Sequence, residues 1–196
     1  MARIDPSRNQ RNRARIAQLA ARLIAEHGLA DWSLAKRKAC RQLGLSDREG
    51  LPANEEIQQA LRDYNNLFRP VAHAEALRRQ RRSALGWMER LTRWNPVLIG
   101  GVAAGWATEH SDVRVELEAD DAKSVELALI NAGVDYSPVQ AGRTAGELLV
   151  GRGADTVRLV ILTPQQRRNR PRRDEDQRMT LAELRSTLDT AVFREA

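Results

Sequence analysis

The chain has 196 residues, of which 42% are hydrophobic and 30% charged, so it is long enough for one large domain or two small ones and polar enough to fold in water. No apolar run approaches the length that crosses a bilayer, and the arginine-rich start has no apolar stretch of a secretory signal, so we expect a cytoplasmic protein without a membrane partner. The net charge is +6, mostly from arginine, and the single cysteine, Cys40, excludes an intramolecular disulfide and a cysteine-based zinc site.

The first half of the chain is predicted to be helical. Residues 1–10 are expected to be disordered, and beyond them apolar residues recur at the spacing of one helical stripe. Gly28 and Gly44 end two of the helices, because glycine readily adopts the left-handed conformation that follows a helix. Four helices are predicted: from Arg11 to the Gly28 cap, from the Asp31 or Ser33 cap to Gly44, from the Asn54 cap to Phe68, and from about Ala72 to Trp94.

After Pro96 the apolar residues alternate with a period of two, which is typical of strands. The predicted elements are strands at 97–99, 113–117, 134–139, 148–150 and 157–162, a helix capped by Asp120 and Asp121, a loop at 165–178, and a last helix that begins with a capping box of Thr180 and Glu183. The whole pattern predicts an α+β fold, in which an N-terminal helical region, residues 1–70, is followed by a mixed sheet flanked by helices, residues 71–196.

The segment LIGGVAAGWATEHSDVRVEL, residues 98–117, has the outline of a phosphate-handling site. Gly100 and Gly101 are predicted to form a tight strand-to-helix turn, where the absence of side chains lets the backbone approach a phosphate. Asp112 lies at the start of the next strand. Carboxylates two residues apart on a strand point to the same face, where they can share the Mg²⁺ ions that nucleotidyl transfer requires.

This segment resembles the signature of the polymerase-beta-type nucleotidyltransferase superfamily. The features that match are the apolar strand, Gly100-Gly101, the lead-in Thr-Glu-His-Ser at 108–111, and Asp112-Val113. The specific match covers about twenty residues and a loose topological match about a hundred. The stretch LPANEEIQQALRDYNNLF also resembles uncharacterised bacterial proteins described as nucleotidyltransferase-like. The resemblance implies a nucleotidyltransferase-like mixed sheet in the second half of the chain.

Two positions depart from the family pattern. The resemblance implies acids two residues after Asp112 and near the start of a later strand, but the chain has Arg114 and Arg158 there. Arginine stays protonated and repels Mg²⁺, so it cannot replace a carboxylate ligand. We therefore expect a catalytically degenerate site without a cofactor, in which Gly100, Gly101, Arg114 and Arg158 bind the phosphate of a nucleotide or nucleic acid.

An alternative hypothesis is an active, Mg²⁺-dependent nucleotidyltransferase. Its catalytic residues would be Asp112, Glu116 on the same strand face, and a third acid, for which Asp155 is one candidate. The three histidines are too far apart in sequence to suggest a further metal site.

Clustered arginines suit phosphate, because the guanidinium group donates two parallel hydrogen bonds. Candidate nucleic-acid-binding residues are Arg78, Arg79, Arg81, Arg82, Arg167, Arg168, Arg170, Arg172 and Arg173. The first of these two clusters is expected to face outward. A third hypothesis is a helical nucleic-acid-binding regulator that uses the basic residues of its second helix, namely Lys36, Arg37, Lys38 and Arg41.

Overall fold

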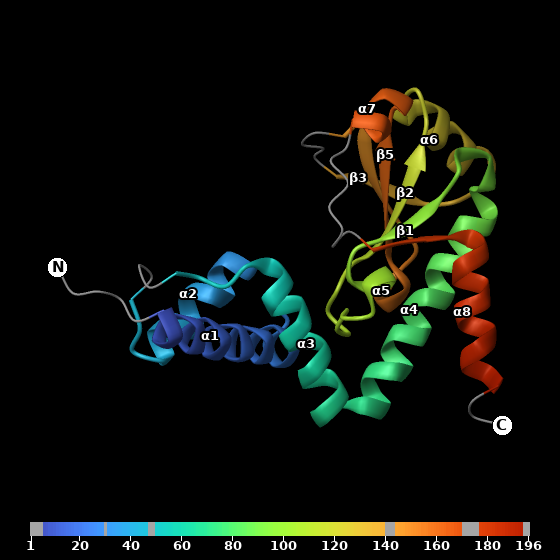
Figure 1. Ribbon diagram of the computed structural model, residues 1–196. Helices are drawn as coiled ribbons and strands as arrows, with labels where there is room; N and C mark the ends of the chain where they lie inside the picture. The colour runs from blue at the N-terminus through green and yellow to red at the C-terminus, as the bar shows by residue number, and fades with distance from the viewer. Residues whose placement is uncertain (1–5, 30, 47–49, 140–143, 170–176, 194–196) are drawn as a thin grey trace. The chain divides into compact units, whose positions relative to one another are not determined.

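The computed structural model describes residues 6–29, 31–46, 50–139, 144–169 and 177–193 (Figure 1). Within them the chain has an α+β fold, with N-terminal helices followed by a mixed sheet and its flanking helices, as predicted. Contacts divide the chain into two compact units. We call Met1–Ala76 with Trp106–Ser111 the helical unit, and Leu77–Gly105 with Asp112–Ala196 the sheet unit.

The helical unit is built from α1 (Pro6–His27), α2 (Trp32–Gln42) and α3 (Asn54–Phe68). The carboxylate of Asp31 caps α2 by accepting the N–H groups of Ser33 and Leu34. Two predictions were wrong here. Residues 6–10 are helical, because α1 extends back to a proline that needs no N–H donor in a first turn. The N-cap of α3 is Ala53, whose N–H is accepted by Glu56, so Asn54 already lies inside the helix.

Small side chains dominate the core of the helical unit. The fully buried positions along α1 and α2 are largely alanines: Ala17, Ala20, Ala21, Ala25, Ala35 and Ala39. Alanine at a helix interface lets the helices pack closely, and Ile57 and Leu61 of α3 fill the remaining space. The rings of Trp32 and Trp106 meet edge to face with their centroids 5.0 Å apart, and this contact attaches residues 106–111 to the helices.

The helix α4 (Pro70–Arg90) begins in the helical unit and continues into the sheet unit. The remaining elements are the 3-10 turn Thr92–Trp94, β1 (Val97–Ile99), α5 (Gly101–Ala104), β2 (Val113–Glu118), α6 (Ala122–Asn131), β3 (Tyr136–Val139), β4 (Gly146–Val150), the 3-10 turn Gly153–Asp155, β5 (Val157–Leu162), α7 (Pro164–Asn169), β6 (Arg178–Thr180) and α8 (Leu181–Phe193). The predicted loop at 165–178 was partly wrong, because it contains α7 and the first residue of β6. No helix in the described ranges combines the length and apolarity that a membrane span needs.

The six strands form one sheet in the order β3-β4-β5-β2-β1-β6. The central pair β2 and β5 is parallel, and every other neighbouring pair is antiparallel. One face of the sheet is apolar, with Leu98, Val115, Leu148 and Leu159 fully buried along it. Gly146 lies on the same face, and a Cβ at Gly146 would lie 2.7 Å from the Cβ of Ala122, the first residue of α6. The helix α6 therefore covers this face. The opposite face contains the charged residues of β2, β4, β5 and β6, and it holds the candidate site.

Candidate functional site

The glycine turn, the start of β2 and the start of β5 lie at the same end of the sheet. Because β1 is antiparallel to β2, Ile99 at the end of β1 is the register partner of Arg114 near the start of β2. Because β2 is parallel to β5, Arg114 is also the register partner of Arg158. The fold thus brings together Gly100, Arg114 and Arg158, although nearly sixty residues separate the first from the last in the sequence.

The turn itself requires glycine. Gly100 has φ 75° and ψ −155°, a conformation that L side chains rarely adopt, and Gly101 begins α5 directly afterwards. No heavy atom of the described structure lies within 4 Å of the position that a Cβ on Gly100 would occupy, so the space beside the turn is open. The predicted strand-to-helix turn is confirmed, whereas Asp112, expected at the start of the adjacent strand, lies directly before its first residue, Val113.

The helix α4 supports this turn through Arg81. Its Nε donates to the carbonyl oxygen of Val102 at 3.1 Å, and its Nη2 donates to that of Ala103 at 3.4 Å. These carbonyls belong to α5, whose last turn leaves them without helical donors. Burial of the guanidinium lowers the pKa of Arg81, because burial disfavours the charged form. Arg81 therefore points to α5 and not outward, which corrects the expectation for this arginine.

Arg158 lies between two carboxylates. Its Nη2 and Nε donate to one oxygen of Asp112 at 3.1 and 3.2 Å, and its Nη1 donates to Glu147 of β4 at 3.2 Å. Arg158 and Glu147 are largely buried, whereas the side chain of Asp112 is 61% exposed. Asp112 is therefore held in an ion pair by an arginine that it shares with Glu147.

Arg114 differs from Arg158 in its surroundings. It is exposed, and it makes no ion pair or hydrogen bond with any residue that the structure describes. Since it lies next to Arg158 on the same sheet face, its guanidinium group stays available to a ligand at the open glycine turn.

Glu116 occupies a different environment two residues further along β2. Its side chain is completely buried, and it forms ion pairs with Arg178 of β6 and with Arg167 of α7, the latter at 3.4 Å. Arg167 also donates to Glu118 at 2.8 Å. The three elements β2, α7 and β6 are thereby joined through one buried carboxylate. Glu116, the second catalytic acid of the active-enzyme hypothesis, is enclosed by arginines at this position.

The arginine clusters are only partly available to solvent. Arg79 and Arg82 of α4 are exposed, Arg78 and Arg81 are half-buried, and Arg168 of α7 is exposed. Arg170, Arg172 and Arg173 lie outside the described residues. On α2 of the helical unit, Arg37, Lys38 and Arg41 are exposed, whereas Lys36 donates to Asn54 at 2.9 Å. Asp155 is exposed in its 3-10 turn, and its carbonyl oxygen accepts the hydroxyl of Ser83.

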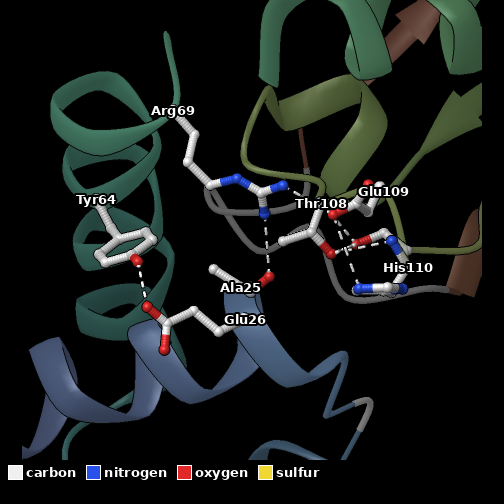
Figure 2. Close-up of polar contacts among 8 residues, drawn as sticks. Ala25, Glu26, Tyr64, Arg69, Thr108, Glu109 and His110 are labelled. Carbon is white, nitrogen blue, oxygen red and sulfur yellow. Dashed lines mark hydrogen bonds and ion pairs between the residues drawn. The ribbon is translucent and has the colours of Figure 1, made fainter. Parts of the chain in front are cut away.

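Residues 106–111, which precede Asp112, belong to the helical unit, and Figure 2 shows polar contacts of Thr108, Glu109 and His110. Arg69, at the end of α3, donates to the carbonyl oxygen of Ala25 at 3.3 Å and to Glu109 at 2.9 Å. Thr108 accepts the N–H of His110 at 3.3 Å, and the ring of His110 lies against Gly28. The lead-in segment 108–111, which we matched to the family motif, thus attaches to the helices through Arg69 and Gly28.

Sequence reasoning missed the partners of these charged residues. Glu147, Arg167 and Arg178 come from β4, α7 and β6, which are far from β2 in sequence, so no local spacing indicated them. A usable signal was present in β2 itself, where Arg114, Glu116 and Glu118 alternate with buried valines and leucine. Three charges on one strand face, one of them fully buried, require partners from neighbouring elements.

The arrangement suits anion binding better than metal binding. Among the described residues, no group of three or more histidine, cysteine, aspartate or glutamate side chains is placed to hold a metal ion. The carboxylates nearest the turn are paired with Arg158, and the remaining donor there is the guanidinium of Arg114.

No family model matches the chain, and no curated protein matches it.

Proposed function

We propose that the sheet unit is a nucleotidyltransferase-like module that binds a phosphate group of a nucleotide or nucleic acid, in the cytoplasm, without efficient metal-dependent transfer. One observation carries the proposal: the exposed Arg114 lies beside the open turn at Gly100, at the end of the sheet where Arg158 is already held in ion pairs by Asp112 and Glu147. The guanidinium of Arg114 can donate two parallel hydrogen bonds to phosphate oxygens.

The charges argue against the two-metal chemistry of the family that the motif resembles. That chemistry needs carboxylates that hold two Mg²⁺ ions against the attacking and leaving oxygens. Here the positions of the second and third acids are Arg114 and Arg158, and Asp112 is paired with one of them. To ligate Mg²⁺, Asp112 and Glu147 would have to lose their ion pairs with Arg158 beside the further positive charge of Arg114, so the residues present do not fit Mg²⁺.

The proposal is tested by calorimetric titration of the full chain with ATP and with a single-stranded oligonucleotide, each with and without Mg²⁺. Binding is expected without Mg²⁺, and Arg114→Ala is expected to weaken it by about tenfold, the loss of a charge-assisted pair of hydrogen bonds. Arg93→Ala is the matched control, because Arg93 is also an exposed arginine of the sheet unit but lies before β1, at the end of that strand away from Gly100. Equal effects of the two variants would refute a site at Arg114.

Asp112 distinguishes the proposal from an active enzyme. Asp112→Ala removes one of the two carboxylates that neutralise Arg158, so phosphate binding is expected to stay the same or become tighter. In a metal-dependent enzyme the same change would abolish transfer. The measurement is transfer of label from ATP, CTP, GTP and UTP to protein, RNA and small-molecule acceptors with Mg²⁺ or Mn²⁺. Robust transfer by the unmodified protein that disappears in Asp112→Ala would overturn the proposal.

A further inference from the structure

A groove of about 970 Å³ runs between α1 and α3 of the helical unit. Its lining includes Ala17 and Leu19 from α1, Ala60 and Tyr64 from α3, and Leu43 from the end of α2. Ala17 and Ala60 contribute only small side chains to its floor. None of the residues that line the groove comes from 106–111.

The two helices that form the groove run in the same direction. Near their beginnings, Arg13 of α1 donates to Glu56 of α3 at 2.6 Å. Near their ends, Tyr64 of α3 donates to Glu26 of α1 at 2.7 Å. Because residue numbers rise together from the first contact to the second, the helices are parallel, and residues near Gln18 lie level with residues near Gln59.

The two edges of the groove carry opposite charges. On the α1 edge the arginines are Arg15 and Arg22, and the only acid lining that edge, Glu26, is held by Arg22 and Tyr64. On the α3 edge the charged residues that line the groove are the acids Glu56, which is paired with Arg13 of α1, and Asp63. The groove therefore has a basic side and an acidic side that run in parallel along its length.

Large apolar side chains stand exposed at the far end of the groove. Leu67 is 73% exposed and Phe68 is 65% exposed, and both line the groove next to Tyr64. The rings of Tyr64 and Phe68 are in contact, with their centroids 4.9 Å apart. Leu67, Phe68 and Tyr64 thus form an exposed apolar end of the groove, whose burial against a partner would be favourable.

We propose that this groove binds the same groove of a second copy of the chain, about a two-fold axis parallel to α1 and α3. If two copies meet groove to groove, the two-fold axis that relates them lies in the plane of contact and can run either along the helices or across them. An axis along the helices places the basic α1 edge of each copy against the acidic α3 edge of the other. An axis across the helices places the two α1 edges against each other and the two acidic α3 edges against each other, and the second of these contacts is repulsive. The charge pattern thus selects the parallel arrangement, in which Leu67 and Phe68 of each copy face the end of α1 of the other.

The first test is the mass of the full chain by light scattering from about 1 to about 100 μM, the range in which a dimer of micromolar affinity dissociates. Leu67→Lys or Phe68→Lys is expected to raise the dimer dissociation constant by at least about tenfold. Leu127→Lys is the control, because Leu127 is also an exposed leucine, at 58%, but lies on α6. A monomer throughout this range, or equal effects of Leu67→Lys and Leu127→Lys, would overturn the proposal.

The second test determines how the two copies are oriented relative to each other, that is, whether the two-fold axis runs along the helices or across them. Differently tagged Gln18→Cys and Gln59→Cys chains, each in a Cys40→Ala background, are mixed and treated with a short bismaleimide. We expect the heterologous Gln18–Gln59 product to dominate, since these residues lie on opposite edges of the groove. Predominance of the Gln18–Gln18 product would indicate the crosswise axis and refute the proposal.

A third test exchanges the charges of Arg22 and Asp63 and measures the dimer dissociation constant. A variant that is only destabilised would not recover its affinity when the second charge is exchanged. Arg22→Glu alone and Asp63→Arg alone each place like charges across the parallel interface, so each is expected to weaken the dimer. The double variant Arg22→Glu/Asp63→Arg exchanges the two edges and restores complementarity, so its dissociation constant is expected to return towards that of the unmodified chain. A double variant weaker than both single variants would contradict the parallel arrangement, as would dissociation that is insensitive to salt.

Discussion

In the helical unit the charged side chains surround a core of small apolar residues, whereas in the sheet unit they occupy one face of the sheet itself. Only Asn12 and Asn65 are buried polar residues within the described part of α1 to α3, and neither carries a charge. In the sheet unit Glu116 is fully buried and paired with two arginines. Close packing therefore stabilises the first unit, and the second depends in addition on paired charges, so the two should respond differently to changes in volume and in charge.

The largest expected effect is that of Glu116→Ala on the sheet unit. Removing Glu116 leaves Arg178 without its buried partner and Arg167 paired with Glu118 alone, and because both arginines keep some exposure we expect a loss of about 3 kcal/mol in the free energy of unfolding. Hydrogen exchange of the β2 and β5 amides measures it. Glu89→Ala is the control, because it removes an exposed ion pair with Arg185 and is expected to cost under about 1 kcal/mol. Equal losses would show that Glu116 contributes no more than a surface charge.

The helical unit is expected to be more sensitive to added volume. Gly28 and Gly44 both follow helices with φ near +65°, but a Cβ on Gly28 would lie 2.9 Å from Cγ of His110, whereas Gly44 has open space. Gly44→Ala should cost about 1 kcal/mol for the left-handed conformation alone, and Gly28→Ala about 2 kcal/mol. Chemical denaturation that monitors the helical unit measures both. If Gly28→Ala loses no more free energy of unfolding than Gly44→Ala, His110 and its segment 106–111 move away from the added methyl group without cost.

Within the arginine cluster of α4, the half-buried Arg81 and the exposed Arg79 are expected to differ in their contribution to stability. Arg81→Ala removes the donors to the carbonyls of α5 and should cost about 1 to 2 kcal/mol, since each bond has a charged donor in a partly buried setting. Arg79→Ala changes an exposed residue and should stay within about 0.5 kcal/mol. Thermal unfolding measures both. An unchanged stability in Arg81→Ala would mean that the glycine turn does not depend on α4.

The smallest effect concerns Glu26 of the helical unit. The hydrogen bond from Tyr64, and then that from Arg22, holds the pKa of Glu26 below its ordinary value of 4.5. A lowered pKa in the folded state stabilises the protein above the ordinary value, and this contribution disappears as the pH falls through the lowered pKa. Tyr64→Phe should therefore raise the pKa of Glu26, and its effect on stability should shrink in acid. Carbon-detected NMR titration of the Glu26 carboxyl measures the shift. A lower pKa in Tyr64→Phe would contradict this assignment.

The sequence by itself determined the α+β class, the strand at 113–117 and the turn at Gly100. Amphipathic spacing and glycine conformation are local properties, so a short segment is sufficient to specify them. The arginines at 114 and 158 were likewise visible as departures from the motif that the segment resembles. Residues 6–10 and the segment around α7 were mispredicted, because their apolar periodicity is weak and tertiary contacts such as that of Arg167 with Glu118 determine their structure.

Only the tertiary structure decided which charges are paired and which are available. Arg114 and Arg158 have the same chemistry in the sequence, yet Arg158 lies between Asp112 and Glu147 whereas Arg114 is exposed. Asp112 and Glu116 likewise differ only by position on β2, but Glu116 is buried between arginines that come from α7 and β6. The physical reason is that an ion pair depends on distances across neighbouring strands and helices, and these distances are set by sheet order and register, which local sequence spacing does not contain.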